Sequence, residues 1–277
     1  SWEKGLFRVK TDGNIENLRN DPKNPHSISS DFVRSCCEDN LGNIWIGTDN
    51  GVCRYNYIRD KFEPILLKAD DGESIRGEIR SITTDKNGHI WMIVKGQGLF
   101  CYNTKYSHLH HIGYDTLGIS GFRRILCSKN SGIWLSRYHS PLYHSASGFD
   151  NANDLEPFKD GGWFDSDDVE GIFEGADGQI YVASTVKGIS EIDPISGSIR
   201  SLFHLPAGVT LLDAFFEEKD GSGFPHPQAY GDTICMGPAQ GTLNIIPTTV
   251  FHCQAVTSHA RSWTTMKGYG SARKTAA

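Results

Sequence analysis

The sequence predicts an all-β protein, a β-propeller, and three observations support this. The phrase Asp-x-x-Gly-x-Ile-Trp at residues 39–45 returns at residues 85–91, 46 residues later. Weaker copies follow around Trp134 and Tyr181, 43 and 47 residues further on. Each copy alternates β-branched or aromatic runs with turn residues. Repeats of this length with three or four short strands are typical of propeller blades, which bury their apolar faces by stacking.

The first full copy shows how one repeat is built. Asp39 and Gly42 supply turn chemistry, a carboxylate that bonds backbone amides and a residue free to adopt positive φ. Residues 44–48 read as a strand, residues 49–51 as a second tight turn, and residues 52–55 as a third strand.

The repeats cover most of the chain in order. Residues 5–9 read as the third strand of a blade whose start is missing. Complete blades are expected at about 28–70, 76–115, 120–155 and 168–205, and a fifth begins near residue 215. Residues 145–167 form either an inserted loop or a weak outer strand. We therefore expect an incomplete propeller of about four full blades plus partial blades.

The character of the chain changes after residue 220. Residues 221–277 contain one acidic residue and four basic ones, and both the strand alternation and the repeat phrase are lost. Two separate stretches of this segment regain the phrase when the codons are read at one shifted offset. We therefore predict a propeller fragment over residues 1–220 and a frameshifted or non-native tail over residues 221–277.

Composition and motifs exclude several classes. A net charge of −6 argues against nucleic acid as a partner, and no run of 18 apolar residues suits a membrane span. The seven cysteines lack zinc-ligand spacing, and no glycine-rich phosphate loop or nucleophile elbow is present. The histidines at 108, 110 and 111 have no evident carboxylate partner. We expect no catalytic residues, no metal and no cofactor.

The repeated aromatic residues are predicted to be structural. One stands at the same place in each of four repeats, where it packs between neighbouring blades. These residues are Trp45, Trp91, Trp134 and Tyr181.

A second repeated position is a candidate binding site. Arg34 and Arg80 stand five residues before the turn aspartate, and the equivalents in the next blades are Arg123, Glu170 and Asp213. This position enters the innermost strand, so the charged groups would converge near the central channel, where guanidinium groups suit sugar hydroxyls or carboxylates. The alternative is a ring of salt bridges between blades. Trp163 either stacks on a sugar or fills its long connector.

The repeat phrase at residues 39–55 and 85–102 resembles the two-component regulator propeller, and the resemblance covers residues 1–221. It implies the periplasmic sensor region of a hybrid two-component histidine kinase, in a membrane-anchored parent that forms a homodimer. It also implies an oligosaccharide as ligand and control of glycan-use genes by the parent. No kinase motif lies in this chain, so the fragment itself is predicted not to be an enzyme.

Two other functions stay open. One is a scaffold or protein-interaction propeller with no small ligand. The other is a propeller lyase or hydrolase, which acidic side chains or a metal site converging on one face would favour.

Overall fold

A computed structural model describes residues 4–9, 14–56, 58–66, 68–118, 120–146, 155–164, 167–175 and 177–203 with their side chains, except that of residue 203. It also describes the backbone of four later strands within residues 211–246. Its described residues contain no helix that is both long and apolar enough to cross a membrane.

Over the described residues the chain forms five four-stranded antiparallel sheets and one two-stranded sheet. We call them blades A to E and the half-blade. The half-blade pairs β1 (Leu6–Val9) with β2 (Ile15–Leu18), and blade A consists of β3 (Val33–Glu38), β4 (Ile44–Thr48), β5 (Gly51–Asn56) and β6 (Lys61–Pro64). Blade B consists of β7 (Ile79–Thr84), β8 (Ile90–Val94), β9 (Gly98–Asn103) and β10 (His108–Ile112), and blade C of β11 (Phe122–Ser128), β12 (Gly132–Arg137), β13 (Tyr143–Ser145) and β14 (Glu156–Pro157). Blade D consists of β15 (Val169–Glu174), β16 (Ile180–Ser184), β17 (Gly188–Ile192) and β18 (Ile199–Phe203), and blade E of β19 (Leu211–Lys219), β20 (Ser222–Ala229), β21 (Asp232–Met236) and β22 (Leu243–Ile246).

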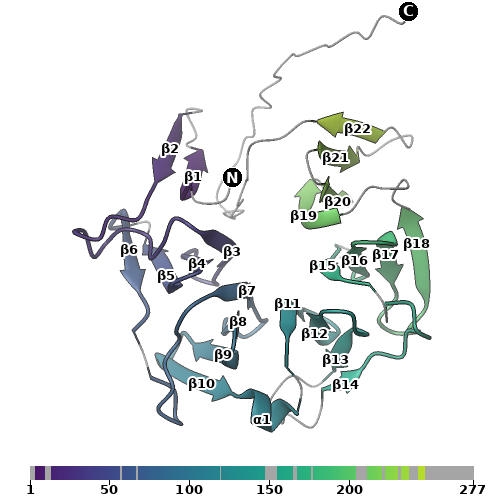
Figure 1. The fold of residues 1–277 in the computed structure, drawn as a ribbon, viewed down its shortest axis with the longest axis horizontal. Coiled ribbons are helices and arrows are strands. Elements are labelled where there is room, and N and C mark those ends of the chain that lie inside the picture. Colours follow the sequence, from purple (N-terminus) through teal and green to yellow (C-terminus); the bar gives the residue numbers. More distant parts are fainter. Residues whose placement is uncertain are drawn as a thin grey trace, which may run out of the picture.

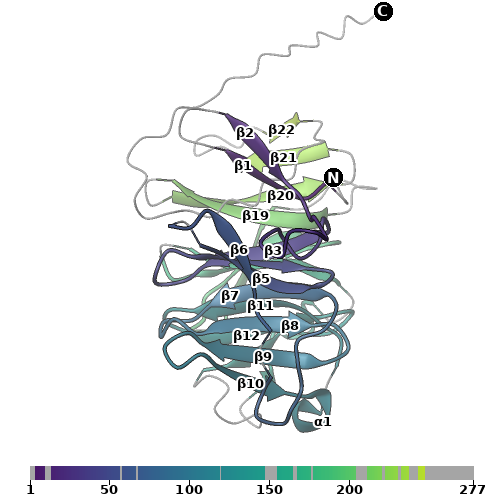
Figure 2. The ribbon, with the colours of Figure 1, turned by 90° about the vertical axis from the view of Figure 1, so that its left-hand side faces the viewer.

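The blades stand around a common centre, with the first strand of each blade innermost (Figure 1). Successive inner strands contact each other, from β3 through β7, β11 and β15 to β19. A short helix, α1 (Tyr114–Leu117), leads from blade B to blade C on the outside of the ring. The side view shows the strands of neighbouring blades stacked across one another (Figure 2). The predicted all-β propeller is confirmed.

The turn phrase of the repeat forms a hydrogen-bonded unit. Asp39 Oδ1 accepts hydrogen bonds from the backbone amides of Leu41 and Asn43, each at 2.9 Å. Asp39 Oδ2 accepts a hydrogen bond from the Trp45 Nε1–H, also at 2.9 Å. Asp85 receives the same three kinds of bond in blade B, including that of Trp91 at 3.0 Å. The turn aspartate therefore ties the repeated tryptophan to its own hairpin.

Blades C and D replace this aspartate in different ways. In blade C the hydroxyl of Ser128 accepts the amides of Asn130 and Ser131, while Ser131 Oγ accepts the Nε1–H of Trp134 at 3.0 Å. In blade D the Tyr181 hydroxyl donates to Asp177 at 2.9 Å. The aromatic residue keeps a polar partner although the turn sequence changes.

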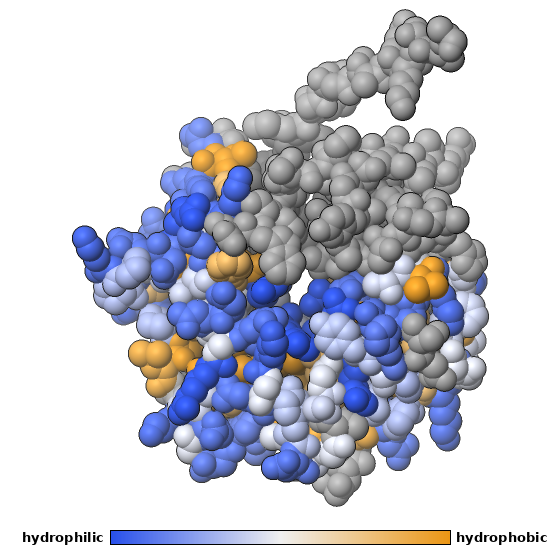
Figure 3. Space-filling view, in the orientation of Figure 1, coloured by the Kyte–Doolittle hydropathy of each residue, from blue (hydrophilic) through white to orange (hydrophobic). Residues whose placement is uncertain are grey.

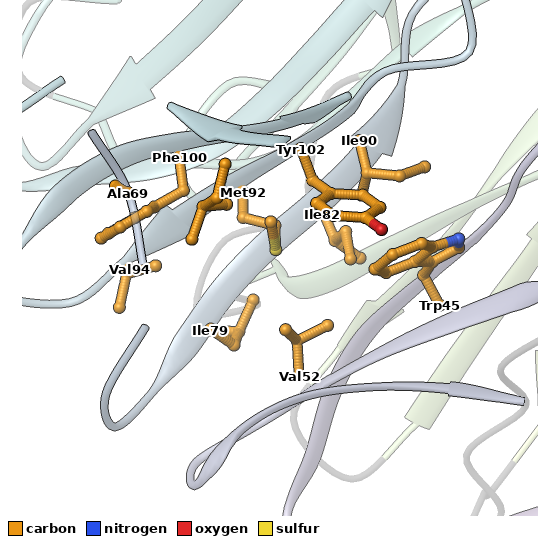
Figure 4. Packing of buried hydrophobic residues seen from close by; sticks show 11 residues of the cluster. Trp45, Val52, Ala69, Ile79, Ile82, Ile90, Met92, Val94, Phe100 and Tyr102 are labelled. Carbon is orange, nitrogen blue, oxygen red and sulfur yellow. The ribbon is translucent and has the colours of Figure 1, made fainter. Parts of the chain in front are cut away.

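The three repeated tryptophans lie between blades. Trp45 is fully buried against blade B, beside Ile82 and Tyr102, and its ring centroid lies 5.1 Å from that of Tyr102 (Figure 4). Trp91 packs into the core of blade C and Trp134 into that of blade D. Burying several large apolar side chains at each junction provides the main force that stacks the blades.

Blade E crosses the boundary that the sequence predicts at residue 220. Strand β19 pairs with β20 through Lys219 and Ser222, and strands β21 and β22 follow. The description of residues 221–277 as frameshifted stays a prediction, and residues 247–277 lie outside the described residues.

Candidate functional site

Every inner strand carries a one-residue β-bulge near its start. The register shifts between Val33 and Ser35 in β3, and corresponding shifts occur in β7, β11, β15 and β19. A bulge leaves one residue out of the ladder and redirects its side chain. The residues in the five bulges are Arg34, Arg80, Arg123, Glu170 and Leu212. We call the side of the ring where the inner strands begin the bulge face.

The repeated position found in the sequence is thus the bulge in four of the five blades. The expected equivalent in blade E, Asp213, is wrong by one residue, because Asp213 pairs with Gln228 and Leu212 takes the bulge. Asp213 lies eight residues before Gly221 in the sequence, as Arg34 lies before Gly42. Strand β19 continues its pairing to Lys219, beyond the point where the other inner strands end, and this displaces the count.

Blades C and D are joined by ion pairs at the bulges. Arg123 Nη1 lies 2.6 Å from Glu170 Oε1 and 3.6 Å from Asp168 Oδ2. Arg124 Nη2 lies 3.7 Å from Glu170 Oε2, and its Nε–H donates to the Glu170 carbonyl oxygen. Only 2% of the Glu170 side chain is exposed, so these arginines supply the charge partners that a buried carboxylate requires.

A second group of charges surrounds Glu78, just before β7. Lys95 Nζ lies 2.9 Å from Glu78 Oε2, and Arg80 Nε lies 3.8 Å from Glu78 Oε1. Burial opposes ionisation of Glu78, but Lys95, Arg34 and Arg80 outweigh it and lower the pKa of this carboxyl. Arg80 also donates from Nη1 to the Phe122 carbonyl oxygen at 3.2 Å, which connects blade B to blade C.

Tyr138 joins the two charged groups. It follows the end of β12 on the bulge face, and its ring centroid lies 4.5 Å from Arg123 Cζ and 5.5 Å from Arg80 Cζ. Its exposed fraction of 44% leaves part of the ring open to a ligand.

Sequence reasoning missed Tyr138. The signal was its position directly after the second strand, which Asp49 and Lys95 occupy in blades A and B.

Trp163 occupies a different part of the bulge face. Its Nε1–H donates to Ser190 Oγ at 3.1 Å, and Lys187 Nζ lies 5.0 Å from the ring centroid. It packs against the core of blade D beside β17, two strands outward from the strand that carries Glu170. The structure therefore brings Arg80, Arg123 and Glu170 together and places Trp163 apart from them.

We define the bulge-face site by its charged side chains and the central tyrosine: Arg34, Glu78, Arg80, Lys95, Arg123, Tyr138, Asp168 and Glu170. Its cations and carboxylates are nearly balanced, so donors and acceptors stand side by side around an exposed aromatic ring. This combination suits a polyhydroxylated ligand, because each hydroxyl both donates and accepts while the apolar face of a sugar packs on an aromatic ring. On the face shown in Figure 3, hydrophilic residues lie below and beside the middle of the ring.

The histidine-rich strand β10 has carboxylate partners that the sequence did not reveal. His108 Nε2 lies 2.6 Å from Asp70 Oδ1, and His111 Nδ1 lies 2.5 Å from Asp71 Oδ2. Both carboxylates come from the connection between blades A and B. In the part of the chain that the structure describes, no three His, Cys, Asp or Glu residues are arranged to hold a metal ion.

Comparisons with known proteins agree with the repeat pattern. Residues 27–50 match the family model of the two component regulator propeller. "Histidine kinase P4" of Formosa agariphila is 36% identical over 84 residues, which make up 29% of this chain and 6% of that protein. The chain therefore spans a small part of the curated relative that it matches.

Solved structures share the fold at low identity. The extracellular domain of a putative hybrid two component system from B. thetaiotaomicron is 15% identical, with a TM-score of 0.66, over 90% of this chain and 33% of that chain. A virginiamycin B lyase from Staphylococcus aureus is 14% identical, with a TM-score of 0.60, over 90% of this chain and 79% of that chain. At these identities the likeness shows the fold alone. The predicted resemblance to two-component regulator propellers is confirmed.

Proposed function

We propose that this two-component regulator propeller is the ligand-sensing part of a hybrid sensor histidine kinase and that it binds an oligosaccharide at the bulge-face site. The observation that carries the proposal is Tyr138, a part-exposed ring held between the guanidinium groups of Arg80 and Arg123. The ring offers a stacking surface, and the flanking ion pairs offer both donors and acceptors to hydroxyl groups.

The charges and positions of the site residues indicate the charge and length of the expected ligand. Because Glu78, Asp168 and Glu170 largely balance the basic side chains, a neutral saccharide needs no counter-charge at this site. Arg34 joins the site through its electrostatic effect on Glu78. Trp163 contributes only to a ligand long enough to extend outward across blade D.

The cellular setting of the proposal follows from the resemblance to two-component regulator propellers. We propose that the chain lies in the periplasm, that its parent is membrane-anchored and homodimeric, and that ligand binding biases the kinase between two arrangements and so alters transcription of glycan-use genes. In this proposal the fragment itself is not catalytic, since Asp168 and Glu170 are held by arginines rather than presented as a free acid and base.

Isothermal titration of the chain with neutral oligosaccharides of four to eight residues tests the proposal. Tyr138→Ala should weaken binding of a saccharide that binds the parent chain by about fivefold or more, because stacking on an aromatic ring contributes on the order of 1 kcal/mol or more. Tyr106→Ala removes a more exposed tyrosine from the turn between β9 and β10 of blade B and should leave the affinity unchanged. If no saccharide binds, the scaffold function takes its place. If a saccharide binds and both variants bind it like the parent chain, the site does not lie at Tyr138.

A further inference from the structure

The connection between blades A and B is fastened to the outer strand of blade B by histidines. We call residues 68–78 the connector. Asp70 of the connector contacts His108 at 2.6 Å and His110 at 3.5 Å. Asp71 contacts His111 at 2.5 Å, and Ala69 forms a β-bridge with Leu109. Strand β10, on the outside of the ring, therefore holds the first part of the connector, residues 69–71 (Figure 1).

His111 is the most buried of the three histidines that contact the connector. Its side chain is only 9% exposed and its ring stacks on Phe100 with centroids 4.4 Å apart. Its Nε2 lies 2.8 Å from the Gln97 carbonyl oxygen, and its Nδ1 faces the Asp71 carboxylate. A carbonyl oxygen and an ionised carboxylate both accept hydrogen bonds, so both ring nitrogens must carry a proton for both bonds to exist.

Asp71 is ionised in the folded protein. The backbone amide of Glu73, which donates to Asp71 Oδ1, and then His111 lower the pKa of the Asp71 carboxyl. The contacts with Asp70 join solvent-exposed side chains, so they add little to the holding force. The pair of His111 with Asp71, in which the histidine is only 9% exposed, is therefore the strongest of these histidine–aspartate contacts.

Gln97 links this pair to the bulge-face site. Its Nε2 donates to the Ser74 carbonyl oxygen at 2.8 Å, and its Oε1 accepts the Arg76 amide at 2.8 Å. Two residues further along the connector, the Lys95 amide donates to the Glu78 carbonyl oxygen at 2.9 Å. The connector that His111 fastens thus continues directly into Glu78 and the strand that carries Arg80.

We infer that His111, Asp71 and Gln97 form a proton-dependent clamp that sets the order of the connector and, through it, of the Glu78 and Arg80 side of the bulge-face site. The expected consequence is that the bulge-face site is better ordered in mild acid than in mild alkali. This consequence rests on the proposed function of that site. Charged groups facing the clamp come from the connector, from β10 and from the β8–β9 turn: Asp70, Asp71, Glu73, His108, His110 and Lys95.

The direction of the pH dependence follows from the two partners. The lowered carboxyl pKa gives a contribution that is present above the ordinary aspartate value and is lost as the pH falls through the folded value. The contribution of His111 needs a proton on both ring nitrogens, because Nδ1 faces the Asp71 carboxylate and Nε2 faces the Gln97 carbonyl oxygen, so one of the two bonds is lost once a rising pH removes a proton. The clamp is therefore closed in mild acid, between these limits.

Amide hydrogen exchange of the ligand-free chain tests the clamp. The protection factors of the Arg76 and Lys95 amides, corrected for intrinsic exchange, should fall about tenfold between about pH 6 and about pH 8, because a charge-assisted hydrogen bond is lost. Asp71→Asn changes an exposed side chain and should give the lower protection at both pH values. His111→Gln should do the same.

His89→Gln is the matched control, because His89 makes a similar contact with Asp85 at 3.1 Å. His89 lies in the turn between β7 and β8, on the face opposite the bulge face. This variant should keep the full pH response. Protection that does not change with pH in the parent chain overturns the clamp. A response at Arg76 without one at Lys95 overturns the link to the bulge-face site. Neither result bears on saccharide binding, which the titration above tests separately.

Discussion

Removing the turn aspartate of blade A should cost far more stability than removing its counterpart in blade D. Asp39 is buried and accepts hydrogen bonds from the amides of Leu41 and Asn43 and from the fully buried Trp45 indole. Asp39→Ala leaves these donors without their acceptor inside the blade. Asp177 is exposed and accepts from the Tyr181 hydroxyl and one backbone amide, at a place that water can reach.

The magnitude follows from the number of lost bonds. Hydrogen bonds to a charged group contribute about 1.5–3 kcal/mol each, and a buried donor left unsatisfied costs about 1–3 kcal/mol. Since water and local relaxation recover part of this, Asp39→Ala should lower the free energy of unfolding by about 3–5 kcal/mol. Asp177→Ala should cost about 1 kcal/mol or less, as is usual for exposed positions.

Urea unfolding monitored by tryptophan fluorescence measures both variants. Asp39→Asn keeps one acceptor oxygen and should lie between Asp39→Ala and the parent chain, which keeps the series measurable if the alanine variant does not fold. Combining Asp39→Ala with Trp45→Phe should be less costly than the sum of the two changes, because both remove the same bond. Equal losses for Asp39→Ala and Asp177→Ala, or strictly additive costs, would refute this account of the repeat.

Two further changes probe the blade junctions. A Cβ atom at Gly47 would lie 2.7 Å from Cγ2 of Ile79 in blade B. Gly47→Ala should therefore destabilise the chain by about 1–3 kcal/mol through overpacking, which lowers the urea midpoint. An unchanged midpoint would show that the junction is loosely packed. Glu170→Ala leaves Arg123 without its closest carboxylate and should cost about 2–4 kcal/mol in the same assay; a cost below about 0.5 kcal/mol would show that Asp168 alone holds the arginine.

Much of the fold could be predicted because the information is local. The aspartate, glycine and aromatic residue that define each repeat act within one hairpin, as the bonds from Trp45 to Asp39 and from Trp91 to Asp85 show. Stacking then follows from the apolar residues that each hairpin leaves uncovered. Even in blade C the substitution of Ser128 for the aspartate keeps the turn, because a hydroxyl also accepts the backbone amides.

The candidate site was only partly predictable because its contacts join different blades. The repeat spacing found Arg34, Arg80, Arg123 and Glu170, but the β-bulge that displays them depends on the pairing of two strands. Tyr138 stands in a turn whose sequence carries no repeat phrase. Its role depends on two arginines that lie 58 and 15 residues earlier in the chain.

The histidines of β10 and the end of the repeat pattern show two further limits. The partners of His108 and His111 lie 38 and 40 residues earlier, in the connector, so no local spacing indicates them. In blade E, the loss of the repeat phrase removed the signal by which the first four blades were counted. Backbone pairing there extends past residue 220, and the frameshift remains a prediction for sequencing of the gene to test.

The measurement that tests the central claim most directly is hydrogen exchange of the chain with and without a saturating neutral oligosaccharide identified by titration. The account predicts slower exchange in the β11 bulge around Arg123 and in the turn that contains Tyr138. Exchange that slows only on the opposite side of the ring, around the turns of Asp39 and Asp85, would contradict the placement of the site at the bulges.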